Sequence, residues 1–281
     1  MRERVYVVDF DRVNHYILKV AASETETAMP VGGKLKVGVD LGTAYIVLVV
    51  LDEDNNPVAC EKQAAGVLRD GVVVDYTGAL NIVRDLKSRL EKRLNRELEY
   101  CAIAMPAGTE SSTRTHQYVA EGAGFEVTAV IDEPTAANAI YQISDGVVVD
   151  IGGGTTGLAI FRKGRVEEIE DEPTGGTHLS LVLAGSYGIP FQRAEEMKQD
   201  YARHREILPV VRPVIEKMAS IVGKYIDKTA TERIYLCGGT CCLTGIEEIF
   251  TKQLGIETVK PDNPFLVTPA GIAMNCKIQG Q

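Results

Sequence analysis

The stretch at residues 147–160, VVVDIGGGTTGLAI, decides the fold, because the chain carries a second stretch built in the same way. In it, an apolar segment ends at Asp150 and continues through a glycine-rich turn into a second apolar segment. Residues 37–50, VGVDLGTAYIVLVV, repeat this order around Asp40. The two aspartates are 110 residues apart, and so are Gly42 and Gly152. This spacing fits two copies of one α/β unit, and we expect a duplicated fold whose equivalent loops face each other.

Strand and helix patterns alternate from residue 36 onwards, which is typical of an α/β protein with layered sheets. We expect one helix over 191–204, and a separate helix over 213–228 that begins at Pro213, because proline suits a first helical turn. Apolar residues at steps of three and four predict a short helix near the amino terminus, either packed on the body or acting as a detachable docking segment. The expected domains are an N-terminal segment and linker, lobe I, lobe II and a C-terminal helix returning toward lobe I, at residues 1–34, 35–145, 146–267 and 268–281.

Composition excludes several functional classes. The 281 residues carry a net charge of −9 and are 45% hydrophobic. An acidic chain without a basic stripe argues against nucleic-acid binding and against a polybasic membrane patch. The longest apolar run, Ala44–Leu51, is much shorter than the roughly 20 residues that span a bilayer. No signal peptide is recognisable, and the six cysteines show no metal-ligand spacing, so we expect reduced thiols and a cytoplasmic protein.

Two common nucleotide motifs do not fit the glycine-rich turn. Gly152, Gly154 and Gly157 match the spacing of the dinucleotide fingerprint, but that fingerprint requires a helix after the glycines. The residues that follow, LAIF, a Lys-Gly turn and VEEI, have a β pattern instead. The ordinary P-loop sequence does not occur in the chain.

The repeated turns nevertheless suit a polyphosphate. Glycine lets backbone N–H groups approach an anion without an intervening Cβ. Asp40 and Asp150 would stand at the strand ends beside the phosphates, and Mg²⁺ commonly uses one or two carboxylates together with phosphate oxygens. The alternative is that both are ordinary β-turns, in which aspartate and glycine serve only local geometry.

Three further groups of residues are candidates for the same site. Glu133 precedes a helix of small residues, where it would orient the attacking water or simply stabilise the helix dipole. Two more glycine pairs stand before helices, where the backbone can approach a ligand closely: Gly175-Gly176-Thr177 and Gly238-Gly239-Thr240. Glu195 and Lys198 share one helix face, as ligand contacts or as an exposed ion pair.

Taken together, these motifs resemble the actin, heat-shock-chaperone and sugar-kinase ATPase superfamily over residues 36–273. The segments VGVDLGTA, IDEPTAANA, VVDIGGGTTGLAI, AEEMK, YLCGGT and TPAGIA occur in that family's order. The resemblance implies an α/β, duplicated actin-like ATPase (ribonuclease-H-like) fold, with two lobes and a nucleotide cleft between them. The sequence as a whole is most similar to the chaperone-like proteins of ethanolamine utilisation, whereas its segment AEEMK is closer to bacterial actin-like proteins.

By that resemblance, the cofactors are ATP and Mg²⁺, and each candidate has a role. Asp40, Glu133 and Asp150 would position the nucleophilic water and Mg²⁺, with Asp40 and Asp150 acting on the metal through water. Glu195 and Lys198 would meet the ribose. The phosphates and the adenosine would lie against the glycine segments: Gly42, Thr43 and Ala44; Gly152, Gly153, Gly154 and Thr155; Gly175, Gly176 and Thr177; and Gly238, Gly239 and Thr240.

Three departures from the chaperone pattern weaken hydrolysis more than binding. Ala44 stands where many chaperones have a second phosphate-binding Thr, and Cys242 stands where they place an Arg against adenine. Lys62 lies in the stretch where a catalytic Lys is expected, without a clear match. Chaperones also carry a peptide-binding domain after the ATPase domain, so we expect any client to contact the body or the N-terminal segment.

The expected function is therefore that of an ATP-binding, slowly hydrolysing, chaperone-like protein of ethanolamine utilisation. Its partners would be ATP or ADP and proteins of ethanolamine catabolism or of a microcompartment shell, without nucleic acid or membrane. The alternatives are an actin-like filament-forming ATPase and a small-molecule kinase of the same superfamily.

Overall fold

The computed structural model describes residues 8–28, 32–105 and 110–278. Parts of the expected N-terminal segment, residues 1–7 and 29–31, lie outside this range. The chain divides into two compact units. The Asp40 unit comprises Asp9–Gln142 and Leu266–Gln281, and the Asp150 unit comprises Ile143–Phe265 with Met1–Val8. The lobe boundaries expected from the sequence stay a prediction.

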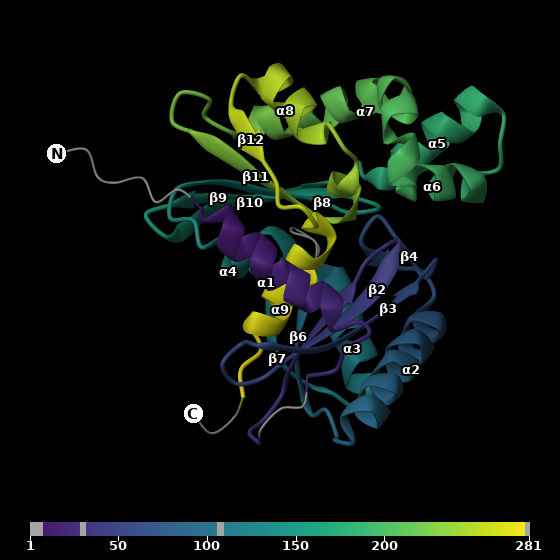
Figure 1. The fold of residues 1–281 in the computed structure, drawn as a ribbon, viewed down its shortest axis with the longest axis vertical. Coiled ribbons are helices and arrows are strands. Elements are labelled where there is room, and N and C mark those ends of the chain that lie inside the picture. Colours follow the sequence, from purple (N-terminus) through teal and green to yellow (C-terminus); the bar gives the residue numbers. More distant parts are fainter. Residues whose placement is uncertain (1–7, 29–31, 106–109, 279–281) are drawn as a thin grey trace. The chain divides into compact units, whose positions relative to one another are not determined.

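The Asp40 unit is built on a five-stranded sheet of order β3-β2-β1-β6-β7. Strands β1, β2 and β3 are antiparallel neighbours, whereas β1, β6 and β7 run parallel. The strands are β1 Lys36–Leu41, β2 Tyr45–Leu51, β3 Pro57–Ala64, β6 Tyr100–Met105 and β7 Glu126–Asp132, with a small hairpin of β4 Leu68–Arg69 and β5 Val72–Val73. The helices are α1 Phe10–Ala22, α2 Tyr76–Leu94, α3 Glu110–Gly122, α4 Glu133–Tyr141 and α9 Val267–Met274 (Figure 1).

Small residues let α9 lie directly against β1 and α4. A Cβ added at Gly38 on β1 would stand 2.5 Å from the Ala273 amide nitrogen and 2.6 Å from the Pro269 carbonyl oxygen. A Cβ added at Gly271 would collide with the Ala136 carbonyl. The backbones of α9, β1 and α4 are therefore in direct contact, and larger residues at these glycines would force them apart.

Helix α1 packs on the body of its own unit. Its apolar stripe of Val13, Ile17 and Val20 is buried, and the Arg12 guanidinium donates to the Ile140 carbonyl at 2.8 Å. That carbonyl lies in the last turn of α4, so the arginine satisfies an acceptor at a helix end. Of the two alternatives for this segment, the structure shows the packed helix.

The Asp150 unit repeats the same topology with the order β10-β9-β8-β11-β12. Again the first three strands are antiparallel and the next two join in parallel. The strands are β8 Gly146–Ile151, β9 Thr156–Arg162, β10 Arg165–Glu172, β11 Arg233–Cys237 and β12 Glu257–Val259. The helices α5 Gly176–Tyr187, α6 Phe191–Gln199, α7 His204–Tyr225 and α8 Ile246–Leu254 lie along one face of this sheet (Figure 1). Equal strand order and direction in the two units confirm the predicted duplication.

The predicted helix boundaries near residue 200 are wrong. Helix α6 ends at Gln199, and α7 runs continuously from His204 to Tyr225 with Pro209 and Pro213 inside it. Each interior proline removes one backbone hydrogen bond and disfavours a helix. Burial of one apolar stripe along α7 against the core outweighs this cost: Ile207, Val211, Ile215, Met218 and Val222. Sequence reasoning also missed β3, β12 and the β4–β5 hairpin.

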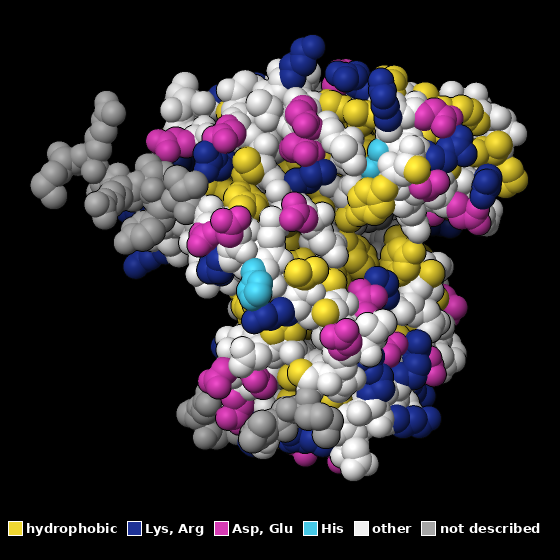
Figure 2. All heavy atoms as spheres, viewed as in Figure 1, with side chains coloured by type: hydrophobic (Ala, Val, Ile, Leu, Met, Phe, Trp, Pro, Cys, Tyr) yellow, Lys and Arg dark blue, Asp and Glu magenta, His cyan; other side chains and the backbone are white. Residues whose placement is uncertain are grey.

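Helices α5 and α6 expose large apolar side chains. Leu181 is 54% exposed, and Tyr187 and Phe191 are 39% and 37% exposed. In the short 3₁₀ segment that follows α6, Tyr201 is 61% exposed. Figure 2 shows apolar side chains gathered at the edge of the molecule where α5 and α6 lie. Within the described residues, no helix is both long enough and apolar enough to cross a bilayer.

Candidate functional site

The carboxyl ends of two parallel strands bring Asp150 and Gly238 together. Asp150 on β8 pairs in register with Cys237 on β11, whose Sγ lies 3.5 Å from Asp150 Oδ2. Gly238 follows with a φ of +90°, and a Cβ there would collide with Asp150 Oδ1 and lie 2.5 Å from the Ile151 carbonyl oxygen. Only glycine fits this position, since it combines a left-handed backbone with contact against the carboxylate.

Three glycine segments far apart in sequence meet at this edge of the sheet. The Gly176 amide donates to the Gly152 carbonyl at 2.9 Å, and the Thr177 amide donates to the Gly153 carbonyl at 2.8 Å. From the third segment, the Thr240 hydroxyl donates to the same Gly152 carbonyl at 2.7 Å. The structure thus brings together the predicted segments 152–155, 175–177 and 238–240.

These contacts fix the orientation of the carbonyl groups in the turn at Gly152–Thr155. Its Gly152 and Gly153 carbonyl oxygens accept bonds from the neighbouring segments, so the oxygens that would repel an anion are engaged inside the unit. A Cβ at Gly175 would stand 2.6 Å from the Gly154 carbonyl carbon and 2.7 Å from that of Gly153. The turn is therefore tightly packed. The Gly152 amide donates to the Thr155 carbonyl at 3.0 Å, so the later N–H groups of the turn are the ones that could bind an anion.

Glu195 and Lys198 stabilise the glycine segment that packs against this turn. The Lys198 ammonium donates to the Gly176 carbonyl at 3.1 Å and to Glu195 Oε2 at 2.8 Å, and the Ser180 hydroxyl also donates to Glu195 Oε2 at 2.5 Å. Burial alone would raise the pKa of Glu195, but Lys198 and Ser180 outweigh it and lower that pKa. Burial lowers the pKa of Lys198. The ion pair of the second alternative is present, but its Lys198 and Glu195 side chains are only 12% and 25% exposed, while contact of the pair with a ribose stays a prediction.

Sequence reasoning missed Asp171 on β10. The register pairs Asp150 with Gly157 on β9, and Gly157 with Asp171. The pKa of Asp171 is raised to about 7, chiefly by burial and also by the charges of Asp150 and Glu172, although a hydrogen bond from the Thr155 side chain lowers it. Its Oδ1 is buried and has no hydrogen-bond partner among the residues that the structure describes. A perturbed acid of this kind beside a glycine turn is typical of functional sites.

In the Asp40 unit, Asp40 and the start of α4 lie at one edge of the sheet. Val39 pairs with Ile103 on β6, and Met105 at the end of β6 pairs with Asp132 on β7. Asp40 and Asp132 thus stand near the carboxyl ends of parallel strands. The predicted turn of Gly42, Thr43 and Ala44 joins β1 to β2, and a Cβ at Gly42 would lie 2.6 Å from the Tyr45 carbonyl oxygen.

Asp132 caps α4, and Glu133 is the first residue of that helix. The Thr135 amide donates to Asp132 Oδ1 at 2.8 Å, and burial raises the pKa of Asp132. Sequence reasoning named Glu133 and overlooked Asp132, although an aspartate three residues before a threonine amide is a recognisable helix start. The role of Glu133 in orienting water stays a prediction.

Two of the departures noted in the sequence have defined surroundings. The Lys62 ammonium on β3 forms an ion pair with Glu24 at 2.8 Å, in the segment that follows α1. Cys242 is half-buried at the end of a 3₁₀ turn. The lysine in the stretch where the chaperone pattern predicts a catalytic Lys is therefore already paired with a glutamate.

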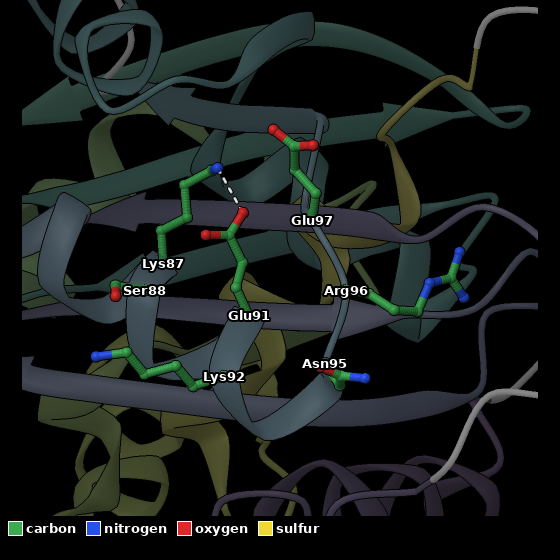
Figure 3. Close-up of a pocket in the computed structure, with 7 residues that line it drawn as sticks. All are labelled: Lys87, Ser88, Glu91, Lys92, Asn95, Arg96 and Glu97. Carbon is green, nitrogen blue, oxygen red and sulfur yellow. Dashed lines mark hydrogen bonds and ion pairs between the residues drawn. The ribbon is translucent and has the colours of Figure 1, made fainter.

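A separate depression on α2 lies among residues with no part in the predicted site. Its lining carries both charges, and Figure 3 shows the Lys87 ammonium turned toward Glu91, with which it forms an ion pair at 2.6 Å. The lining residues are Lys87, Ser88, Glu91, Lys92, Asn95, Arg96 and Glu97. Mixed charge without a glycine turn does not favour a nucleotide there.

The duplicated sheet order, with an aspartate and a glycine turn after the first strand of each copy, defines an actin-like ATPase fold. Two family models agree: that of the cell division protein FtsA matches residues 147–272, and that of the MreB/Mbl protein matches residues 60–182. The chain belongs to the family of the ethanolamine utilization protein EutJ. It is 43% identical over 240 residues to EutJ of Escherichia coli K12, covering 85% of each chain.

Solved structures agree with this assignment. The crystal structure of EutJ from Carboxydothermus hydrogenoformans is 50% identical, with a TM-score of 0.88, covering 95% of this chain and 99% of that one. MreB5 of Spiroplasma citri bound to ADP has a TM-score of 0.66 at 19% identity, covering 86% of this chain and 95% of that one. The second likeness shows the shared fold alone.

Proposed function

We propose that this protein binds ATP with Mg²⁺ and hydrolyses it slowly, in a chaperone-like role in ethanolamine utilisation. The observation that carries the nucleotide part is the junction of three glycine segments around the Gly152 carbonyl in the Asp150 unit. That MreB5 of Spiroplasma citri was solved with ADP, and also with AMPPNP, supports a nucleotide for this fold.

Within the Asp150 unit, the phosphates would lie on the Gly152–Thr155 turn, and the adenosine near Gly238–Thr240. The residues present fit a magnesium nucleotide, because Asp150 stands at the end of β8 and the buried Oδ1 of Asp171 has no donor within the described part of the chain. Mg²⁺ would supply positive charge that neutralises the phosphates. That Asp40, Glu133 and Gly42–Ala44 bind the same nucleotide is a prediction of the duplication.

Slow hydrolysis follows from the surroundings of the chemistry. Phosphoryl transfer depends on positioning and charge neutralisation rather than on covalent catalysis. Ala44 lacks a hydroxyl, and Lys62 already has the carboxylate of Glu24 as its partner. We therefore expect turnover well below that of an ATPase with a free lysine at this place.

The nucleotide proposal is tested by adding one methyl group to either of two glycines. Gly175→Ala would place its Cβ 2.6 Å from the backbone of Gly154 and displace the phosphate turn. Gly185→Ala, on the same segment of chain, meets nothing within 4 Å and is the matched control. Titration calorimetry with ADP and Mg²⁺ should show at least tenfold weaker binding for Gly175→Ala and wild-type affinity for Gly185→Ala.

Wild-type affinity in a folded Gly175→Ala variant would refute the site, and failure of the wild-type protein to bind ADP or ATP would refute the nucleotide function. Thermal stability measured without nucleotide distinguishes a displaced turn from an unfolded protein.

The exposed apolar face of α5 and α6 supports a protein partner. Contiguous exposed apolar side chains commonly mark contact sites between proteins. We propose that proteins of ethanolamine catabolism or of a microcompartment shell bind here, in the cytoplasm. Leu181→Ser should reduce co-sedimentation with purified microcompartments, whereas Leu18→Ser, which alters a 68% exposed leucine on α1, should not. Pelleting of the protein alone with ATP would favour an actin-like filament instead.

A further inference from the structure

Strands β8, β9 and β10 bring two carboxylates into one row across the sheet. Asp150 pairs with Gly157, and Gly157 pairs with Asp171, in antiparallel register. Residues directly opposite each other on antiparallel strands project to the same face. Asp150 and Asp171 therefore share a face, with a residue that has no side chain between them.

Gly157 is buried and has no side chain, and it separates the two aspartates in the row. Neighbouring strands lie about 4.8 Å apart, so the two aspartate Cα atoms are separated by roughly 10 Å. Any other residue at position 157 would project its side chain between them.

The third observation concerns one carboxylate oxygen of Asp171. Its Oδ1 is buried and unpartnered among the described residues, and a buried acceptor left without a hydrogen bond is costly, more so when charged. Such a group calls for a water or an ion as its partner. The side chain of Thr155, the last residue of the predicted phosphate turn, forms a hydrogen bond with Asp171 that favours its charged form. This bond shows that the acid lies next to that turn.

We infer that Asp171 is a positioning residue for the metal: with Asp150 opposite, it accepts a hydrogen bond from water bound to the divalent cation of the nucleotide. This inference rests on the proposed nucleotide function and adds a residue to it. Two carboxylates and the phosphate oxygens form a donor set typical of Mg²⁺ that keeps several waters. An amide at position 171 keeps the size of the side chain and loses the negative charge.

The experiment separates metal from nucleotide with the full chain. ADP affinity is measured by calorimetry in EDTA, and Mg²⁺ is then titrated into the ADP complex. Mn²⁺ binding followed by electron paramagnetic resonance is a second readout. The variants are Asp171→Asn and, as control, Glu168→Gln, which makes the same carboxylate-to-amide change at an exposed position of β10.

We expect Asp171→Asn to bind ADP in EDTA within twofold of wild type, and to need about tenfold more Mg²⁺ or Mn²⁺ for half-saturation, as for a hydrogen bond to a charged group. Glu168→Gln should match wild type in both measurements.

An unchanged metal requirement in Asp171→Asn would overturn the inference and leave the nucleotide function standing. An equal loss of ADP affinity with and without metal would also overturn it, because the acid would then only support the turn. Failure of the wild-type protein to bind ADP under either condition would overturn both.

Discussion

Replacing Asp171 by Asn should stabilise the protein without ligand, and more at pH 8 than at pH 5. Burial raises the pKa of this acid from 3.8 to about 7 in the folded protein. Between these values the folded state holds a proton that the unfolded chain has released. The contribution of Asp171 to the free energy of unfolding is therefore fully present below pH 4, decreases as the pH rises toward 7, and is lost above pH 7. The neutral amide has no such loss.

The shift determines the size of the effect. A displacement of about three pKa units, at roughly 1.4 kcal/mol each, gives an upper limit of about 4 kcal/mol for the advantage of Asn at pH 8. At pH 5 only the first unit of that loss has accumulated, so the advantage is about 1.5 kcal/mol. The difference of roughly 2–3 kcal/mol corresponds to several degrees in Tm for a protein of this size.

Calorimetric unfolding in EDTA, without nucleotide, at pH 5 and pH 8 measures this difference. Glu168→Gln on the same strand is the control and should show no pH-dependent gain. A gain that is equal at both pH values, or a wild type more stable than Asp171→Asn at pH 8, would refute the reasoning. A positive result would mean that the acid is kept at a cost in stability, as expected for a functional group.

Two further changes test the packing of each unit. In the Asp40 unit, Gly271→Val would drive a branched side chain into the Ala136 carbonyl. We expect the free energy of unfolding to fall by about 3 kcal/mol and the Tm to fall in differential scanning calorimetry. A wild-type Tm would contradict the close contact of α9 and α4. In the Asp150 unit, His204 accepts from the Thr244 amide and donates to the Lys198 carbonyl, each at 3.0 Å. His204→Phe leaves both backbone groups unpaired and should cost about 1–3 kcal/mol, measured by urea unfolding, whereas unchanged stability would show that neither bond matters.

Local sequence was sufficient for much of the fold and for part of the site. The apolar strands that end in Asp40 and Asp150 predicted the duplication, because strand ends and glycine turns are encoded within a few residues. The same signals identified the segments at 152–155, 175–177 and 238–240. Glu195 and Lys198 were found from their helical spacing, but their burial and their grip on the Gly176 carbonyl depend on how α5 and α6 pack.

The sequence by itself determined where the chain turns and that strands alternate with helices. The tertiary structure decided which residues lie opposite each other. A hairpin closed at Lys163-Gly164 in simple register would place Glu170 opposite Gly157, and the bulge between Val166 and Glu168 shifts the pairing so that Asp171 stands there instead. One extra residue in a strand moves every later side chain to the other face, and whether it occurs depends on the whole sheet. Helix α7 likewise continues through Pro213, because burial against the core outweighs a local preference.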